Sequence, residues 1–124
     1  MLSSSTLQTL VCTTQLQVAK RFYGETLGLT LTGTSQGALI FAVGESTLRV
    51  SPVPTLSPSV HTVAGFAVHS LQDEMRILAA RGLKFERFAG LAQDADAVLA
   101  LTDGTRVAWF KDPDGNILSL VQYA

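Results

Sequence analysis

The segment Trp109-Phe-Lys-Asp-Pro-Asp-Gly-Asn-Ile-Leu-Ser-Leu-Val-Gln122 predicts two strands joined by a tight turn. Pro113 suits the second position of such a turn, and Gly115 accepts the positive φ that the turn requires. After the turn, successive side chains point to opposite faces of the strand. Leu118 therefore points to one face and Ser119 to the other.

Short matches in a fixed order indicate that the chain contains two copies of a strand–helix–strand–strand–strand unit. Gly28-Leu-Thr-Leu31 resembles Gly82-Leu-Lys-Phe85, and the segment 44–51 parallels 114–121. Between the copies lies Ser51-Pro-Val-Pro-Thr-Leu-Ser-Pro-Ser59, which is typical of a linker. The expected organisation is one domain over residues 1–124, with a first module over about 5–52, a linker over about 52–60 and a second module over about 61–124.

Hydrophobic periodicity predicts one helix and several strands in each copy. The first helix is expected over about 15–27, before Gly28. The second begins after Ser70, which forms a variant capping box with Asp73, and ends at Gly82. Strands are expected near residues 7–14, 29–34, 38–43, 46–51, 62–69, 83–88, 96–101, 105–111 and 117–122.

The composition describes a globular chain rather than a disordered or membrane protein. Hydrophobic residues make up 47% and charged residues 15% of the 124 residues, which is enough apolar material for a core. The net charge is −1 and no basic stripe is present, so we expect neither nucleic acid nor membrane as a partner. No secretory signal is visible, and Cys12 has no second cysteine to pair with, so we expect a cytoplasmic protein with a spectator thiol.

The 109–122 hairpin and the segment Phe22-Tyr-Gly-Glu-Thr-Leu-Gly-Leu29 resemble two signatures of the vicinal-oxygen-chelate superfamily. This superfamily includes glyoxalase I, extradiol dioxygenases and bleomycin-resistance proteins. Catalytic members commonly read DPDGN-x-x-E-L in the hairpin, where the Glu is a metal ligand, and this chain has Ser119 at that position. The resemblance implies an α+β fold in which two βαβββ modules form a cupped, mostly antiparallel sheet with helices on the outer face. It also implies a homodimer.

In metal-using relatives, four positions in the cleft of this sheet supply ligands, and the resemblance places them at Gln8, Arg49, Val63 and Ser119. Zinc, iron or manganese needs about three or more imidazole, carboxylate or thiolate donors in fixed geometry. Gln8 is a tolerable ligand, but Val63 has no donor, the Ser119 hydroxyl is weak and Arg49 would repel a cation. We therefore expect no metal and no cofactor.

Two histidines and two aspartates could each have either a catalytic or a purely structural role. His61 has the same strand parity as Val63, about 7 Å away along the strand, and His69 lies at the opposite strand end. Side chains without a function are the simpler interpretation of both histidines, and a role with a metal or a proton is the alternative. Turn chemistry accounts for Asp112 and Asp114 without acid–base catalysis.

The predicted cleft face carries a few polar groups in a mostly apolar surrounding, as small-molecule sites do. The planar guanidinium group of Arg49 suits a carboxylate, phosphate or enolate oxygen. The simpler interpretation is that Arg49 is an exposed residue of an edge strand and has no role in binding. Trp109 would either stack on a planar ligand or pack in the core. The predicted ligand-binding residues are Gln8, Arg49, Val63, Trp109 and Ser119.

These observations lead to three hypotheses. The first is a metal-free small-molecule-binding protein of the glyoxalase/bleomycin-resistance type, whose ligand is anionic or planar. The second is a glyoxalase- or dioxygenase-like enzyme. Its metal-dependent version has a non-standard site made by Gln8, His61 and a donor from the partner chain, and its metal-free version has Arg49 stabilising an enolate, with His69 as the best candidate for a general base. The third is a catalytically silent dimerisation module.

Overall fold

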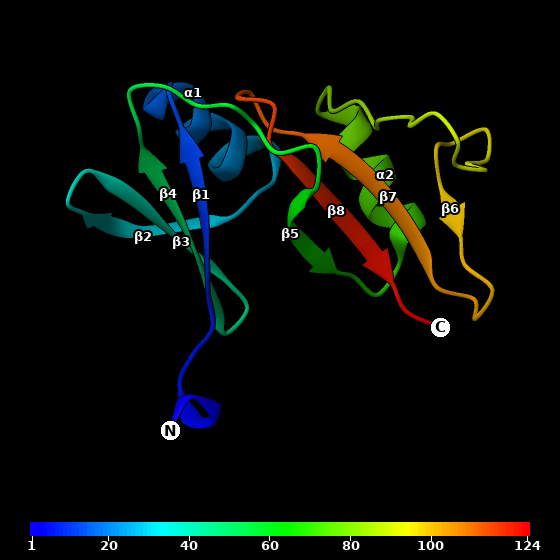
Figure 1. Cartoon of the computed structure of the whole chain (residues 1–124), viewed down its shortest axis with the longest axis horizontal. Helices are drawn as coiled ribbons and strands as arrows, with labels where there is room; N and C mark the ends of the chain where they lie inside the picture. The colour runs from blue at the N-terminus through cyan, green and yellow to red at the C-terminus, as the bar shows by residue number, and fades with distance from the viewer. The chain divides into compact units, whose positions relative to one another are not determined.

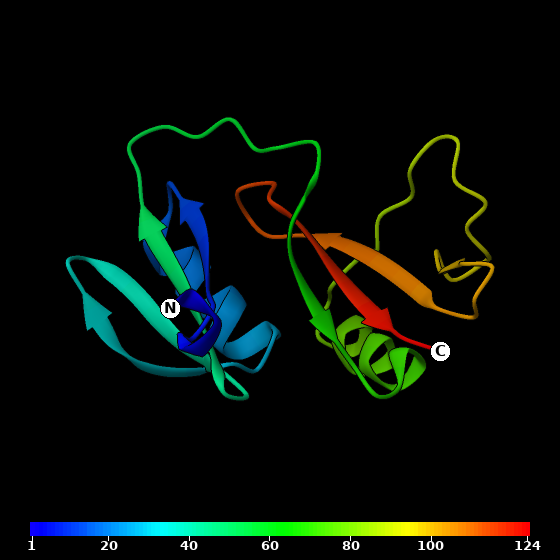
Figure 2. The ribbon, with the colours of Figure 1, turned by 60° about the horizontal axis from the view of Figure 1, so that its bottom comes forward.

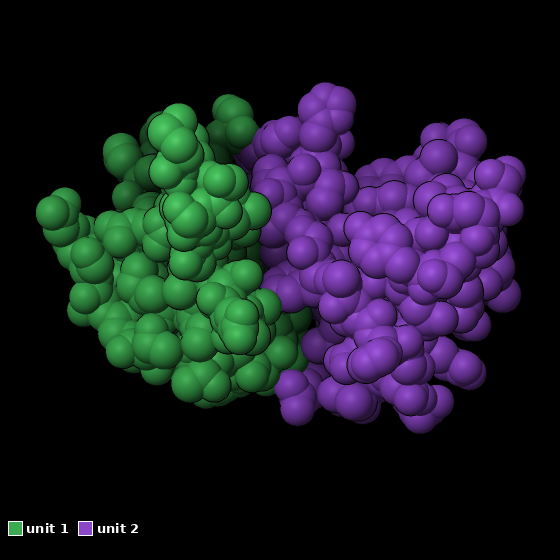
Figure 3. All heavy atoms as spheres, turned by 90° about the horizontal axis from the view of Figure 1, so that it is seen from below, with its two compact units in different colours: residues 1–57 green, residues 58–124 purple.

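The computed structural model describes residues 1–124 and divides them into two compact units, Met1–Ser57 and Pro58–Ala124 (Figure 3). Each unit contains one four-stranded sheet and its own helix. Two of the three strand pairs in each sheet are antiparallel and one is parallel. The predicted α+β fold with two βαβββ modules is confirmed.

The first unit contains a sheet in the order β1-β4-β3-β2, in which β1 and β4 run parallel (Figure 1). Its elements are η1 (Leu2–Ser4), β1 (Gln8–Thr13), α1 (Leu16–Arg21), the π-helical turn η2 (Phe22–Thr26), β2 (Thr30–Ser35), β3 (Ala38–Val43) and β4 (Ser46–Pro52).

The helix predicted over 15–27 is present, but its last turn is wider than an α-helix. The amide of Leu27 donates to the carbonyl of Phe22, an i→i−5 bond that defines the π turn. Tyr23 is fully buried there, with its ring 6.0 Å from the ring of Phe41. Gly28 then ends the helix with a φ of 74°.

Alternation along the strands of the first unit separates a buried face from a more open one. Val11, Thr13, Leu48 and Val50 are buried, whereas Leu10 is 59% exposed. The buried face packs on α1, which contacts β4.

The second unit has the equivalent order β5-β8-β7-β6, with β5 and β8 parallel (Figure 2). Its elements are β5 (Thr62–Ala67), α2 (Leu71–Ala80), β6 (Leu99–Ala100), β7 (Arg106–Lys111) and β8 (Ile117–Gln122). Helix α2 contacts β7 and β8, and Leu118 and Leu120 are buried on that side.

The predicted turn forms in this unit, and of the two bonds of the predicted capping box the one accepted by Ser70 forms. The Ser70 hydroxyl accepts the amide of Asp73 at 3.2 Å, which caps α2. In the β7–β8 turn, Oδ1 of the buried Asp112 accepts the amides of Asp114 and Asn116 at 3.0 and 2.9 Å. Gly115 has a φ of 87°. These bonds account for the Asp112 side chain as a turn-former.

Two predicted strands of the second unit are wrong or too long. Residues 83–88 form no strand, and only Phe85 bridges to Phe110 of β7. The strand expected over 96–101 is reduced to β6, Leu99–Ala100. Side-chain hydrogen bonds hold the intervening backbone in an irregular path, so it does not join the ladder. No helix is long and apolar enough to cross a membrane.

Candidate functional site

A pocket of about 230 Å³ lies on the open face of the second unit, beside Trp109. It is lined by residues that precede and begin β5, by β7, by the start of β8 and by the irregular segment after α2. The lining residues are Val60, His61, Thr62, Phe88, Leu91, Trp109 and Ile117. Its walls are thus mostly apolar and aromatic, with an imidazole and a hydroxyl among them.

The indole of Trp109 is held in a fixed orientation. Its Nε1 donates to the Thr62 hydroxyl at 3.2 Å, and its ring meets the ring of Phe88 edge-on, with centroids 5.6 Å apart. Trp109 remains partly exposed. Because of this exposure, part of the ring surface is available to a planar ligand, and the edge-on contact and the N–H bond keep the ring in one orientation.

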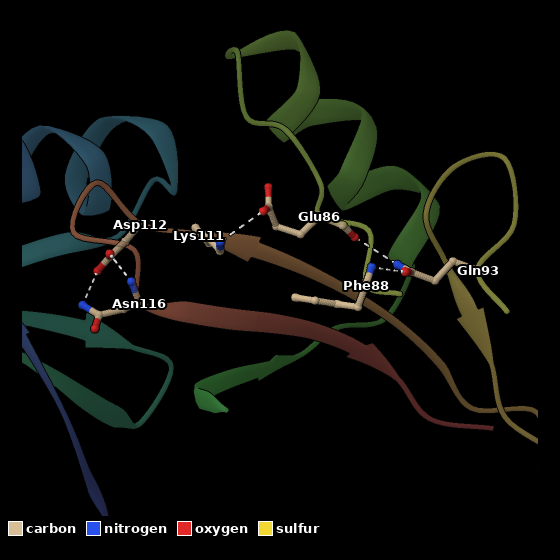
Figure 4. A network of polar contacts seen from close by, with 6 residues as sticks. All are labelled: Glu86, Phe88, Gln93, Lys111, Asp112 and Asn116. Carbon is tan, nitrogen blue, oxygen red and sulfur yellow. Dashed lines mark hydrogen bonds and ion pairs between the residues drawn. The ribbon is translucent and has the colours of Figure 1, made fainter. Parts of the chain in front are cut away.

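The irregular segment that carries Phe88 is organised by the Gln93 side chain (Figure 4). Its Oε1 accepts the amide of Phe88 at 2.8 Å, and its Nε2 donates to the carbonyls of Glu86 and Ala97 at 2.9 and 2.8 Å. Glu86 also forms an ion pair with Lys111 of β7 at 3.5 Å. The Gln93 amide, together with Arg87, whose guanidinium donates to the carbonyls of Asp94 and Ala95, therefore orders one wall of the pocket.

Two carboxylates in the same unit accept backbone hydrogen bonds. The bond from the amide of Val98 is the main cause that holds the pKa of Asp94 below its ordinary value. The amide of Thr105 does the same for the pKa of Asp103. Both side chains organise the backbone on either side of β6 and lie outside the pocket lining.

Ser119 lies on β8 opposite Trp109 and beside Gly65 of β5. It is 6% exposed, and its Oγ lies 2.7 Å from the point that a Cβ on residue 65 would occupy. The absence of a side chain at Gly65 is what leaves room for the Ser119 hydroxyl. Val63, also on β5, is 37% exposed at a shift in the β5–β8 register.

The remaining two predicted residues, Gln8 and Arg49, lie together on the open face of the first unit. Gln8 of β1 pairs with Thr47 of β4, two residues before Arg49, so the two side chains are diagonal neighbours. Nη2 of Arg49 donates to the carbonyl oxygen of Ser35 at 2.9 Å. Because β4 lies between β1 and β3, the interpretation of Arg49 as an edge-strand residue is wrong.

The two units match at these positions, which supports the predicted alignment of the repeats. Leu48 pairs with Thr9 in the first unit as Leu118 pairs with Ala64 in the second. Arg49 is therefore the counterpart of Ser119. By the same pairing, Ile40, opposite Arg49, is the counterpart of Trp109.

The donor set does not fit a divalent metal. The structure contains no group of three or more His, Cys, Asp or Glu side chains that could hold an ion. Four positions correspond to the ligand positions of metal-using relatives. Of these, Arg49 is a cation that donates to a backbone carbonyl, and Ser119 packs against Gly65. The carboxylate, imidazole and thiolate donors that such ions require are missing from this set.

Sequence reasoning named Trp109 but missed part of its surroundings. Phe88 lies at the end of the strand expected near 83–88, and Leu91 lies between two expected strands, so no periodicity assigned them to a face. His61, whose role was open, lines the pocket, whereas His69 is exposed beyond the end of β5 and is not among the lining residues.

Sequence comparison identifies one family. Residues 6–120 match the glyoxalase family, described as Glyoxalase/Bleomycin resistance protein/Dioxygenase superfamily. Among curated proteins, none matches the chain significantly.

Solved structures with the same fold share little sequence with the chain. A protein of the glyoxalase family from Bacillus anthracis superposes with a TM-score of 0.78 at 16% identity, covering 98% of this chain and 96% of that one. A glyoxalase/bleomycin resistance protein from Catenulispora acidiphila gives a TM-score of 0.75 at 18% identity, covering 98% and 100%. Lactoylglutathione lyase from Agrobacterium tumefaciens gives 0.72 at 17% identity, covering 96% and 93%. At these identities the likeness establishes the fold.

Proposed function

The chain belongs to the Glyoxalase/Bleomycin resistance protein/Dioxygenase superfamily, and on that premise we propose that it is a small-molecule-binding protein that holds its ligand without a metal ion. The observation that carries the proposal is the pocket beside Trp109, with its fixed indole and a wall ordered by Gln93. Binding requires no metal donors, and an apolar pocket with a few polar groups is suited to it.

The pocket favours a planar, largely apolar ligand. A flat ring can stack on Trp109, while the Thr62 hydroxyl and the His61 imidazole offer hydrogen bonds at the rim. Separately from this pocket, Gln8 and Arg49 on the open face of the first unit supply an amide and a guanidinium suited to an anionic group. One of the guanidinium donors is used by Ser35, and a guanidinium has five.

Tryptophan fluorescence tests this proposal directly, because Trp109 is the only tryptophan of the chain. The compounds to titrate are bleomycin and lactoylglutathione, which represent the activities named for the relatives, together with a panel of planar aromatic acids. We expect at least one to change the emission saturably, with and without EDTA. At a hundred times its Kd, such a ligand should stabilise the fold by about 2.7 kcal/mol.

Matched variants localise the binding. Phe88→Ala removes the ring that contacts Trp109 and should weaken binding about tenfold or more, whereas Ile77→Ala, on exposed surface of α2, should leave it unchanged. Binding that disappears with EDTA and returns with zinc, nickel, manganese or iron would contradict the metal-free proposal. Failure of every compound to change either fluorescence or melting temperature would instead favour the silent dimerisation module.

A second candidate is a glyoxalase- or dioxygenase-like enzyme, and the position of His61 in the pocket favours it. An imidazole next to a stacked ligand is placed to accept or donate a proton. Turnover of the bound compound that His61→Gln abolishes, while the fluorescence titration is retained, would establish this function. Unchanged ligand after prolonged incubation would exclude it for that compound.

We also propose that the chain forms a homodimer. The edge strands β1 and β5 expose the apolar side chains of Leu10 and Val63, at 59% and 37%. Such edges are commonly covered in native proteins. Light scattering during gel filtration should give twice the mass of 13.2 kDa, and a monomer at micromolar concentration would contradict the proposal.

A further inference from the structure

Each unit has a groove on the side of its sheet that carries the helix. In the second unit the groove measures about 370 Å³ and lies between α2, Phe85 and the start of β7. In the first unit a groove of about 360 Å³ lies between α1, η2, Leu31 and Phe41 of β3. None of their lining residues lines the pocket beside Trp109.

The two grooves are built from equivalent positions. Gln17 and Arg21 are the second and sixth residues of α1, and Gln72 and Arg76 are the second and sixth residues of α2. Residues four apart lie one turn above each other on a helix, so each glutamine shares a helix face with its arginine. Each groove also contains the last residue of the matched repeat segment after the helix, Leu31 of segment 28–31 or Phe85 of segment 82–85.

Both grooves are lined by two cationic side chains and one carboxylate. The second contains Arg76 and Arg106 against one carboxylate, Asp96. The first contains Lys20 and Arg21 against one carboxylate, Glu25. Counted over the lining residues alone, each groove therefore has one positive charge in excess, which complements an anion. In the second groove Asp73, which lies outside the lining, pairs with Arg76, so a bound anion must compete with it.

The second groove has the better apolar floor. Met75 and Val98 are 9% and 4% exposed, and Phe85 is half-buried against Phe110. Arg106 points to this side because it lies two and four residues before the buried Ala108 and Phe110 of β7, and residues at that spacing share one face of a strand. The first groove has Lys20 at the position of Met75, so its floor is more polar.

We propose that these twin grooves bind small organic carboxylates with a flat apolar body. The helix arginine, Arg76 or Arg21, pairs with the carboxylate, and the glutamine one turn earlier donates a further hydrogen bond. The apolar body lies on the floor. The ion pair of Arg76 with Asp73 at 3.1 Å does not prevent this, since both side chains are about two-thirds exposed and such pairs are weak.

Titration of the ¹⁵N-labelled chain with sodium benzoate, followed by NMR, tests the proposal. We expect saturable shifts of the Arg76 Nε–H and of backbone amides in α2, and weaker shifts at Arg21 and α1. Benzamide, which has the same ring without the charge, should bind about tenfold less tightly or not at all, since a charged hydrogen bond is roughly twice as strong as a neutral one.

Three variants make the outcome decisive. Arg76→Gln should abolish the α2 shifts and leave those at α1, while Arg21→Gln should do the reverse. Arg81→Gln removes the same charge just beyond α2 and outside the groove lining, and should change neither. Each variant is first checked by its own ¹⁵N spectrum, so that loss of folding is not mistaken for loss of binding.

The proposal is overturned by any of three results: no saturable shift, equal binding of benzamide, or equal loss of binding in Arg76→Gln and Arg81→Gln. Phe88→Ala disturbs the pocket beside Trp109 and should leave the benzoate shifts at α2 intact. The proposal for the twin grooves can therefore be refuted while the proposed function of the pocket beside Trp109 stands, and the proposed function can be refuted while the groove proposal stands.

Discussion

The two units share one plan of strands, yet the faces of their sheets opposite the helices differ in chemistry. Where the first unit has Gln8, Leu10, Ile40 and Arg49, the second has Val63, Gly65, Trp109 and Ser119. The first face is amphipathic with a cation, and the second is small, apolar and aromatic. The two units therefore match in Phe41 and Phe110 on the helix-packed side of their sheets and differ on the opposite side, as expected if the opposite side carries function.

The units also differ in the strand that borders each sheet beyond the hairpin. In the first unit, β2 has six residues and pairs with β3 through main-chain bonds. In the second, β6 has two residues, and the preceding segment is ordered by side chains instead. The hydrogen bond from the Phe88 amide to the Gln93 side chain holds the segment in a path that places the ring of Phe88 against Trp109.

The largest expected effect tests whether the helix-packed sides are equivalent. Phe41 and Phe110 occupy matching positions opposite Leu48 and Leu118, and both are fully buried. Phe41→Ala and Phe110→Ala should each lower the free energy of unfolding by about 3–5 kcal/mol, because each opens a cavity in a packed core. Urea unfolding followed by far-UV circular dichroism measures both, and costs that differ by more than about 2 kcal/mol would break the equivalence.

The next effect concerns the side-chain-ordered segment of the second unit. Gln93→Glu keeps an acceptor for the Phe88 amide but places a carboxylate against the carbonyls of Glu86 and Ala97. We expect a loss of about 2 kcal/mol near pH 7, since two donations are replaced by repulsion. The control Gln17→Glu is exposed on α1 and should stay within about 0.5 kcal/mol of the parent.

The pH dependence of the Gln93→Glu variant has a defined sign. Facing two carbonyl oxygens raises the pKa of the new carboxyl group in the folded state above its unfolded value of about 4.3. The stabilising protonated form is then fully present below the unfolded pKa and is lost as the pH rises through the folded pKa. The deficit measured by Trp109 fluorescence in urea should therefore shrink at pH 4, and an equal deficit at pH 4 and pH 7 would contradict this account.

How far the sequence predicted this molecule depends on whether the determining contacts are local. The Ser70 cap and the Asp112 turn are made within four residues, and both were predicted correctly. The segment 83–88 alternates like a strand, but Gln93 binds the backbone of residues 86 and 88 and overrides that pattern. The bond from Arg49 to Ser35 spans fourteen positions, and nothing in the local sequence signals it.

A smaller effect tests the contrast between Gly65 and its counterpart Leu10. A Cβ at residue 65 would lie 2.7 Å from Oγ of Ser119, so Gly65→Ala should cost about 1–2 kcal/mol by displacing that hydroxyl. Combining it with Ser119→Ala should recover most of this loss. In the first unit, Leu10→Ala at an exposed position should stay within about 0.5 kcal/mol of the parent. Thermal unfolding of the four variants measures the coupling, and additive costs at residues 65 and 119 would rule out the contact.

The smallest effect is a sensitivity to acid that separates the irregular region of the second unit from the regular sheet of the first. Hydrogen bonds from the amides of Val98 and Thr105 hold the pKa of Asp94 and of Asp103 below the ordinary value of 3.8. Their stabilising contribution is therefore present above that value and is lost as the pH falls through the lower folded-state pKa. The Val98 amide should become less protected from hydrogen exchange between pH 4 and pH 2.5, relative to the Ile40 amide in β3, after correction for the intrinsic exchange rate. Asp94→Asn keeps the acceptor oxygen but removes the titration, so it should flatten the change at Val98; an equal change in the parent and the variant would place the acid sensitivity elsewhere.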